Sequence, residues 1–315
     1  MLSSFPSFVS QNSLLFRTIH GPDCRQKPGD GNQGTVLYWS MGTEGREPGD
    51  GSLVWSVFMK EKFSCRVDHP LLPAFKSQIF AHRGFHDKPA IPENSLPAFR
   101  RAIEHGWGME FDVHLLKDGS LMVFHDEALK RCTGVEGFLE DLTSGEAKQL
   151  RLEGTDEQIP SFDEVLDLVD GRYPLIIELK AFRGNHRSLT EAVLARLASY
   201  KGDFCIESFD PRVIKDVRDL RPDIMRGQLA QNFIQRPENL PKWQRGVLTR
   251  LWFNVLTKPD FVAYRFEDRA DKWVRRSVDK KGAQEFSWTI ASKADFDTCR
   301  AAESIPIFER FDPGV

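Results

Sequence analysis

The feature that most constrains the fold is an alternation of two hydrophobic periodicities from about residue 77 to the C-terminus. Short apolar runs typical of buried strands alternate with segments in which apolar residues recur on one helical face. The expected strands are residues 79–84, 108–116, 120–126, 174–180, 204–209, 224–230, 260–266, 286–290 and 305–311. The expected helices are residues 93–106, 161–171, 189–200, 211–220 and 294–303.

This succession predicts the architecture of the chain. Buried strands that are joined by helices lie in a parallel sheet. About eight strand–helix units in one α/β domain predict a (β/α)8 TIM barrel, which we place over residues 77–315. The segment 231–259 is less regular, and we expect it to hold short helices over one rim.

Residues 1–76 differ in composition from the rest of the chain. A serine-rich start without acids is followed by stretches rich in Gly, Pro and charge, which disfavour packing. We expect a disordered extension or a mis-assigned start, so that deleting residues 1–70 leaves the barrel unchanged. A targeting peptide is the weaker alternative, and Pro6, Gln11 and Asn12 interrupt the apolar core that a signal peptide needs.

Composition narrows the class of protein. A net charge of -3 gives no electrostatic basis for nucleic-acid binding, so no nucleic-acid partner is expected. The five cysteines are scattered and lack CxxC spacing, which favours a reducing, cytoplasmic location over a disulfide framework or a zinc site. No apolar run approaches the roughly 18–20 residues that span a bilayer, so no transmembrane segment is expected. The sequence does not indicate an oligomeric state.

Acids occupy unusual positions at the ends of the expected strands. Glu110 and Asp112 are one residue apart within an apolar run, and Glu178 lies near the end of another. Residues two apart on a strand face the same side, and catalytic groups of barrel enzymes lie at the carboxyl ends of the strands. Three converging carboxylates suit one divalent cation, Mg²⁺ or Ca²⁺, with Mn²⁺ possible. The alternative is simple ion pairing with Arg83 and Lys180.

Histidines and cations lie at the same strand ends. His82 and His125 can serve as a general acid and a general base. Arg83 and Lys180 can hold an oxyanion, so the whole set is typical of phosphoryl transfer. His114 lies two residues after Asp112 and therefore faces the same side of the strand, so it could line the rim of the barrel. Trp288 is either a core residue or a wall for the substrate.

Several motifs resemble those of the glycerophosphodiester phosphodiesterases, and they occur in the family's order. They are "AHRG", "PENSLPAF", "EFDVHLLKDGSLMVFHDEALKRCTG", "IPSFDEVL", "LIIELK" and "SWTI". The resemblance covers residues 77 to the C-terminus, and the last segments are similar to bacterial cytosolic members. One departure is Leu116, where the family often has threonine, and it touches no expected ligand.

The resemblance implies a metal-dependent barrel that cleaves glycerophosphodiesters to sn-glycerol 3-phosphate and an alcohol. It implies His82 and His125 as the acid/base pair. The remaining roles that it implies are metal binding by Glu110, Asp112 and Glu178, phosphate binding by Arg83 and Lys180, and orientation of this shell by Glu93.

Three rival functions remain open on the same barrel. A phospholipase C-like phosphodiesterase would not need the three acids in every subtype. A lysophospholipase D would need an apolar rim, which the stretch 243–256 could supply. A non-catalytic binding module is disfavoured, because the whole set of charged and histidine residues is intact.

Overall fold

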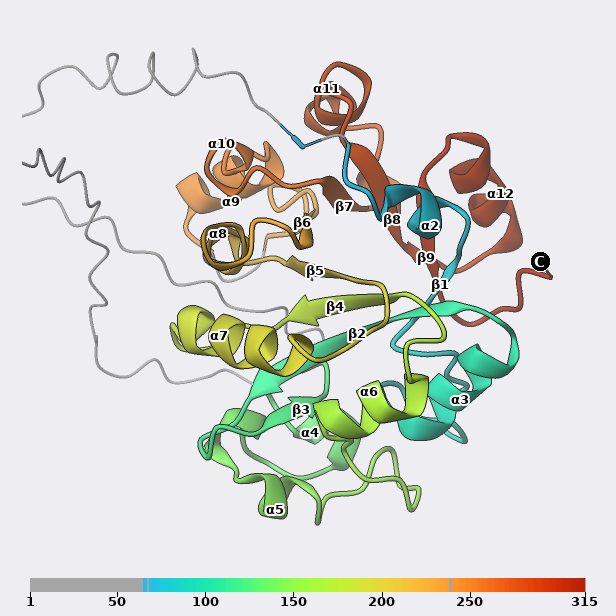
Figure 1. The fold of residues 1–315 in the computed structure, drawn as a ribbon, viewed down its shortest axis with the longest axis vertical. Coiled ribbons are helices and arrows are strands. Elements are labelled where there is room, and N and C mark those ends of the chain that lie inside the picture. Colours follow the sequence, from blue (N-terminus) through green and yellow to red (C-terminus); the bar gives the residue numbers. More distant parts are fainter. Residues whose placement is uncertain (1–64, 67, 238–239, 315) are drawn as a thin grey trace, which may run out of the picture.

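Eight parallel strands close into a barrel in the computed structural model, which describes residues 65–66, 68–237 and 240–314 (Figure 1). The strands are β1 (Phe80–His82), β2 (Gly108–Leu115), β4 (Leu175–Leu179), β5 (Phe204–Ser208), β6 (Met225–Ala230), β7 (Phe261–Arg265), β8 (Gln284–Ile290) and β9 (Ile305–Phe308). The order around the barrel is β1-β9-β8-β7-β6-β5-β4-β2, and β2 pairs with β1 to close it. The predicted TIM barrel is therefore confirmed.

Helices connect the strands and surround the barrel (Figure 1). They are α3 (Leu96–Glu104), α6 (Phe162–Val169), α7 (His186–Leu197), α8 (Pro211–Leu220), α9 (Lys242–Thr249), α10 (Asn254–Thr257), α11 (Lys272–Asp279) and α12 (Lys293–Ala301). Ser95 caps the first of them, since its side chain accepts a hydrogen bond from Ala98 N. The short α9 and α10 lie in the segment predicted to be less regular. Among the described residues, no helix is both long and apolar enough to cross a bilayer.

One strand lies outside the barrel. β3 (Leu121–Val123) runs antiparallel to β2, with Val113 opposite Val123. The hairpin extends β2 beyond the barrel and then returns the chain, so that Phe124 N donates to Asp112 O at 3.1 Å. The short helices α4 (Lys130–Thr133) and α5 (Ser144–Ala147) follow it. The hairpin therefore brings the segment after β3 back to the carboxyl ends of the barrel strands.

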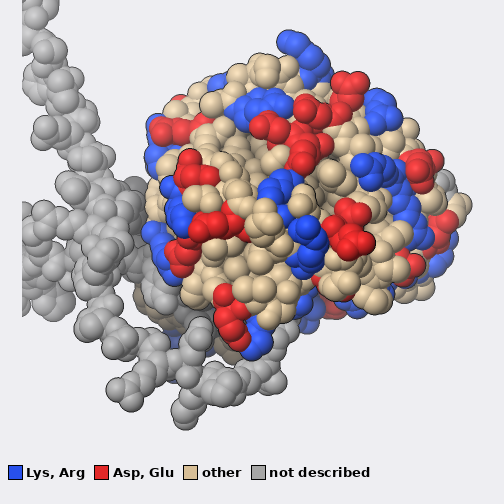
Figure 2. Space-filling view, turned by 90° about the horizontal axis from the view of Figure 1, so that it is seen from below, with Lys and Arg blue, Asp and Glu red and all other residues tan. Residues whose placement is uncertain are grey.

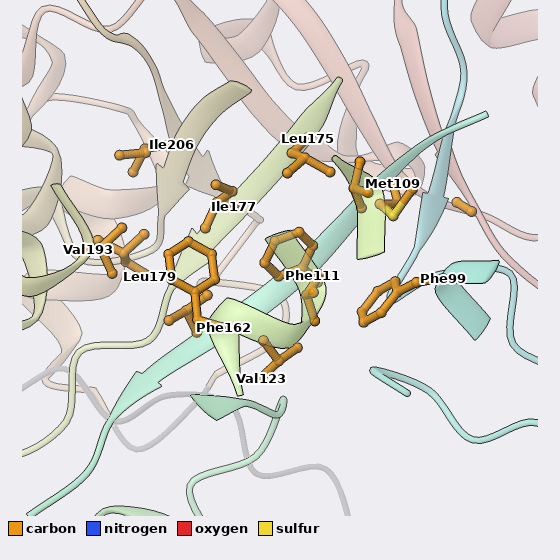
Figure 3. Close-up of a cluster of buried hydrophobic side chains, with 14 of the residues drawn as sticks. Phe99, Met109, Phe111, Val123, Phe162, Leu175, Ile177, Leu179, Val193 and Ile206 are labelled. Atoms are coloured by element: carbon orange, nitrogen blue, oxygen red, sulfur yellow. The ribbon is translucent and has the colours of Figure 1, made fainter. Parts of the chain in front are cut away.

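The outward faces of the strands pack against the surrounding helices. Figure 3 shows Phe111 and Ile177 of the sheet beside Phe162 of α6 and Phe99 of α3. On the face drawn in Figure 2, basic and acidic side chains lie beside one another. Exposed ion pairs of this kind contribute about 0–1 kcal/mol each, so burial of apolar side chains is the main source of stability.

Aromatic rings fill the end of the barrel interior opposite the carboxyl ends of the strands. Phe261 stacks on Phe286 at 4.0 Å between centroids, and Phe75 stacks on Phe80 at 5.2 Å. Gly227 provides the room that these rings need, because a Cβ there would lie 2.0 Å from the Phe261 ring. Aromatic and aliphatic side chains of the described residues thus fill the barrel at this end.

The described residues just before the expected boundary at residue 77 pack on the barrel. Phe75 belongs to the helix α2 (Leu72–Lys76) and is fully buried among the interior residues. Arg66 Nη2 donates to Asp260 Oδ2 at 2.8 Å, and His69 Nε2 lies 2.8 Å from Asp223 O. A deletion of residues 1–70 would remove these two contacts. Residues 1–64 lie outside the described residues.

The Phe75→Ala variant measures what α2 contributes. We expect it to lower the free energy of unfolding by about 3–5 kcal/mol, because a large buried ring is replaced by a cavity. Chemical denaturation monitored by circular dichroism is the measurement. Lys76→Ala, an exposed position on the same helix, should change the free energy by less than about 0.5 kcal/mol. Equal stability of the Phe75→Ala variant and the wild type would contradict the packing described here.

Candidate active site

Three buried carboxylates meet at the carboxyl ends of β2 and β4. Glu110 and Asp112 lie on β2 and Glu178 on β4, with Asp112 directly opposite Glu178 in the strand register. One carboxylate oxygen from each of the three lies within 4.8 Å of the others. All three residues are at most 6% exposed. The sequence placed these acids on one side of their strands, and the structure brings them together.

Two cations lie against the carboxylates. Lys180 Nζ is 3.0 Å from Asp112 Oδ1 and 2.7 Å from Glu178 Oε1. The backbone N–H of Arg83 donates to Glu110 Oε2 at 3.0 Å, and Arg83 Nε is 3.7 Å from Asp112 Oδ2. The ion pairs foreseen as the alternative to a metal site are therefore present.

The charge at the site is not balanced by these cations. Burial and the neighbouring carboxylates raise the pKa of Glu110 well above its ordinary value. Burial likewise raises the pKa of Glu178, although Lys180 opposes the shift. A further cation would relieve this repulsion, and hard carboxylate oxygens are the ligands that Mg²⁺ and Ca²⁺ prefer. The donor set therefore fits a divalent cation.

Asp112 is held in its ionised form. Although burial opposes ionisation, the charges of Lys180 and Arg83 hold the pKa of Asp112 below its ordinary value. Asn94 Nδ2 also donates to Asp112 Oδ2 at 2.8 Å. Sequence reasoning missed Asn94, although its φ of 52° is a conformation that asparagine tolerates better than most residues.

His82 ends β1 and points one ring nitrogen toward the carboxylates. Its Nδ1 lies 2.8 Å from Glu309 Oε2, and its Nε2 lies 3.8 Å from Glu110 Oε2. Burial and the positive charge of Arg83 lower the pKa of His82, while Glu309 opposes this shift. The ring is therefore held between the last strand and the acidic cluster.

His125 follows β3 and reaches the site through the hairpin. Its Nδ1 lies 2.5 Å from Asp126 Oδ1, which also accepts a hydrogen bond from Arg131 Nη2 at 2.9 Å. Burial and the charges of Arg83 and Lys180 lower the pKa of His125 to about 3. Its ring is thus neutral near pH 7 when nothing is bound.

His114 does not line the rim. It is fully buried, and its Nδ1 contacts the carboxylate of Glu140. Its Nε2 lies 3.3 Å from the backbone oxygen of His125. His114 therefore lies within the β2–β3 hairpin and contacts the backbone of His125.

Glu93 and Trp288 lie in different regions around the three carboxylates. Glu93 is 5% exposed and accepts a hydrogen bond from Arg83 Nη1 at 2.9 Å, with Lys88 and Arg131 as further partners. It lies behind Arg83 and fixes its guanidinium. Trp288 on β8 is partly buried, and its ring meets that of Phe209 edge-on at 5.5 Å.

Two further acids lie at strand ends, and the sequence analysis assigned them no role. Glu207 is 1% exposed and lies opposite Glu178 in the strand register. Burial and the charge of Glu178 raise the pKa of Glu207 well above its ordinary value. Glu309 follows β9 and contacts His82. Their positions at strand ends were the signal in the sequence that they could belong to the site. Their partners could not be predicted, because they depend on which strands become neighbours.

Comparison with known proteins identifies the family. The model of the "Glycerophosphoryl diester phosphodiesterase family" matches residues 82–309, which is most of the chain. The chain belongs to this family. It is therefore an enzyme of the phosphoric diester hydrolase class, as the motifs indicated. The match includes all of the site residues described above.

Individual relatives agree with this assignment. A glycerophosphodiester phosphodiesterase of Caldanaerobacter subterraneus subsp. tengcongensis is 31% identical over 233 residues, which cover 70% of this chain and 89% of the relative. The crystal structure of a glycerophosphodiester phosphodiesterase from Thermotoga maritima matches with a TM-score of 0.57 and 28% identity, over 73% of this chain and 93% of that one. An Oleispira antarctica phosphodiesterase in complex with the product sn-glycerol-3-phosphate shares the fold, with a TM-score of 0.61 and 22% identity over 74% of this chain and 92% of that one.

Proposed function

We propose that this phosphodiesterase hydrolyses glycerophosphodiesters to sn-glycerol 3-phosphate and an alcohol with one divalent cation. The observation that carries the proposal is the convergence of three buried carboxylates, two cations and two histidines at one end of the barrel. The product bound in the Oleispira antarctica structure supports the choice of substrate class. The ion is Mg²⁺ or Ca²⁺ by the chemistry of its ligands, with Mn²⁺ as a further candidate.

Glu110, Asp112 and Glu178 hold the cation in this proposal. The bound ion supplies positive charge against the phosphoryl oxygens, which carry the negative charge of the transition state. Lys180 and Arg83 contact the same phosphoryl group, and Arg83 is suited to it because its planar fork can donate two parallel hydrogen bonds. Glu93 holds the Arg83 side chain in place, and Trp288 forms part of the substrate wall.

His82 and His125 transfer the protons. One ring accepts a proton from the nucleophile, and the other donates a proton to the oxygen of the departing alcohol. We assign the donor role to His125. Burial, and next to it the charges of Arg83 and Lys180, lower its pKa in the free enzyme. An anionic phosphodiester beside these cations offsets their charge, so the proton affinity of His125 rises when substrate binds.

A lysophospholipase D acting on long-chain lysolipids is the second candidate. One observation favours it: the segment after β6 carries exposed apolar side chains, with Ile234 53% and Trp243 44% exposed. Such residues could contact an acyl chain. Hydrolysis of glycerophosphodiesters remains the main proposal, because no contact among the described residues connects these side chains to the charged site.

A substrate panel tests the proposal. The purified protein is supplied with glycerophosphodiesters of neutral, cationic and anionic alcohols and with lysolipids, each with Mg²⁺, Ca²⁺ or Mn²⁺. We expect glycerol 3-phosphate, measured by an enzyme-coupled assay, from the glycerophosphodiesters. Cleavage of lysolipids alone would favour the lysophospholipase D, and in that case Trp243→Ala should raise KM for lysolipids. No hydrolysis of any diester with any metal would refute the proposal.

A cytoplasmic location is part of the same proposal. The described cysteines, Cys65, Cys132, Cys205 and Cys299, are all free thiols. Free thiols persist in reducing compartments. Fractionation of cells expressing the tagged full chain would test the location.

A further inference from the structure

We propose that Glu309 is a positioning residue that fixes the ring orientation and the tautomer of His82. The inference rests on the proposed function, because it assigns a partner to one of the two proton-transferring histidines. Glu309 comes directly after β9 and His82 ends β1. Its carboxylate Oε2 lies 2.8 Å from His82 Nδ1, a distance typical of a hydrogen bond to a charged acceptor.

The barrel closure sets this contact. β9 pairs with β1 in parallel, with Phe80 opposite Ile307 and Ala81 opposite Phe308. The next pair in this register is His82 and Glu309, and both side chains point into the barrel, as do those of Phe80 and Ile307. Glu309 N donates to Ile290 O of β8 at 2.9 Å, which anchors its backbone to a third strand.

The contact determines which nitrogen of His82 can react. A carboxylate can only accept hydrogen bonds, so the proton of the neutral ring lies on Nδ1. Nε2 then carries the lone pair, and it is the nitrogen that faces the acidic cluster, 3.8 Å from Glu110 Oε2. Without Glu309 the ring could take the other tautomer or turn about its side-chain bonds. Glu309 therefore prepares Nε2 to accept a proton.

The other neighbours of Glu309 suggest a matched control. Its second oxygen, Oε1, lies 3.0 Å from Nε of Arg310, which is 72% exposed. His86 Nε2 lies 3.6 Å from Oε2. An exposed ion pair contributes little, so Arg310→Ala should leave the Glu309–His82 contact intact. If Glu309 acted mainly through Arg310, the two changes would have equal effects.

The kinetic test compares Glu309→Ala, Glu309→Gln and Arg310→Ala with the wild type, each loaded with the activating metal. We expect Glu309→Ala to lower kcat by about 10–10³-fold with KM changed less than about threefold, because orientation and tautomer matter in the reaction more than in binding. Glu309→Gln should lose less, since its amide oxygen can still accept the Nδ1 hydrogen bond. Arg310→Ala should retain wild-type kcat. Thermal melting confirms that each variant is folded.

A second measurement does not depend on activity. In ¹⁵N-detected NMR of the free enzyme, the His82 ring, assigned by its loss in His82→Gln, should show the Nδ1–H tautomer. The Glu309→Ala variant should shift it toward Nε2–H. An unchanged tautomer and unchanged kcat in Glu309→Ala would overturn the inference, and so would an equal loss in Arg310→Ala. If the wild type hydrolysed no diester, the proposed function would fail, while the tautomer measurement would still decide the role of Glu309.

Discussion

Treatment with a chelator should abolish the diesterase activity of this protein, by at least about 10³-fold, and a divalent cation should restore it. The physical reason is the unbalanced negative charge of Glu110, Asp112 and Glu178. A bound cation would neutralise this charge and would also attract the phosphoryl oxygens of the substrate. The measurement is the rate of glycerol 3-phosphate release after EDTA treatment and dialysis, followed by titration with Mg²⁺, Ca²⁺ and Mn²⁺. Undiminished activity in metal-free buffer with chelator would refute the metal site.

Substitution of one proposed metal ligand tests whether the cation binds at the three carboxylates. Glu178→Gln should raise the metal concentration needed for half-maximal activity by at least about tenfold, because one anionic ligand becomes neutral. Glu207→Gln is the matched control: Glu207 is an equally buried acid on the next strand, but it is outside the three-oxygen cluster. Its half-activating concentration should stay within about threefold of the wild type. Equal shifts in the two variants would indicate general loss of negative charge instead of lost ligation.

Substitution of either proposed proton-transfer histidine should also cause a large loss of activity. His82→Ala and His125→Ala should each lower kcat by about 10²–10⁴-fold, because each removes a proton-transfer group. KM should change much less, since Arg83, Lys180 and the cation still hold the phosphate. His105→Ala is the control, because His105 is exposed at the end of α3 and lies away from the carboxyl ends of the strands.

The leaving group distinguishes the two histidines. A p-nitrophenyl phosphodiester releases an anion that needs no proton, so His125→Ala should recover most of the wild-type rate on it. His82→Ala should remain impaired on both kinds of substrate. If His125→Ala lost the same factor on good and poor leaving groups, His125 would not be the acid, while the metal site and the family assignment would stand.

The parts of the fold that depend on local periodicity could be predicted from the sequence. The buried strands and the amphipathic helices were recognisable, and two-residue periodicity placed Glu110 and Asp112 on one side of β2. α2 was missed, because its single apolar turn lies among prolines and charges next to a stretch of unstructured composition. Its burial depends on Phe80 and Phe286, which no local pattern connects to it.

The parts of the site that depend on long-range pairing could not be predicted. The contact between His82 and Glu309 joins residues 227 positions apart and exists only if the first and last strands are neighbours. The approach of His125 to Asp112 depends on the hairpin register, which one residue of slippage would reverse. Arg131 is the partner of both Asp126 and Glu93, two acids that lie 33 positions apart in the sequence. Sequence patterns indicated which residues were candidates for the site. The closure of the barrel determined which of these residues contact one another.

The pairing of β1 with β9 has a consequence for the synthesis of this protein. A nascent chain that has reached residue 304 already carries all three proposed metal ligands and both histidines, yet it lacks the strand that lies between β1 and β8. His82 then lacks its partner Glu309, and the barrel is open between β1 and β8. The complete set of site contacts therefore forms only once β9 has inserted between β1 and β8.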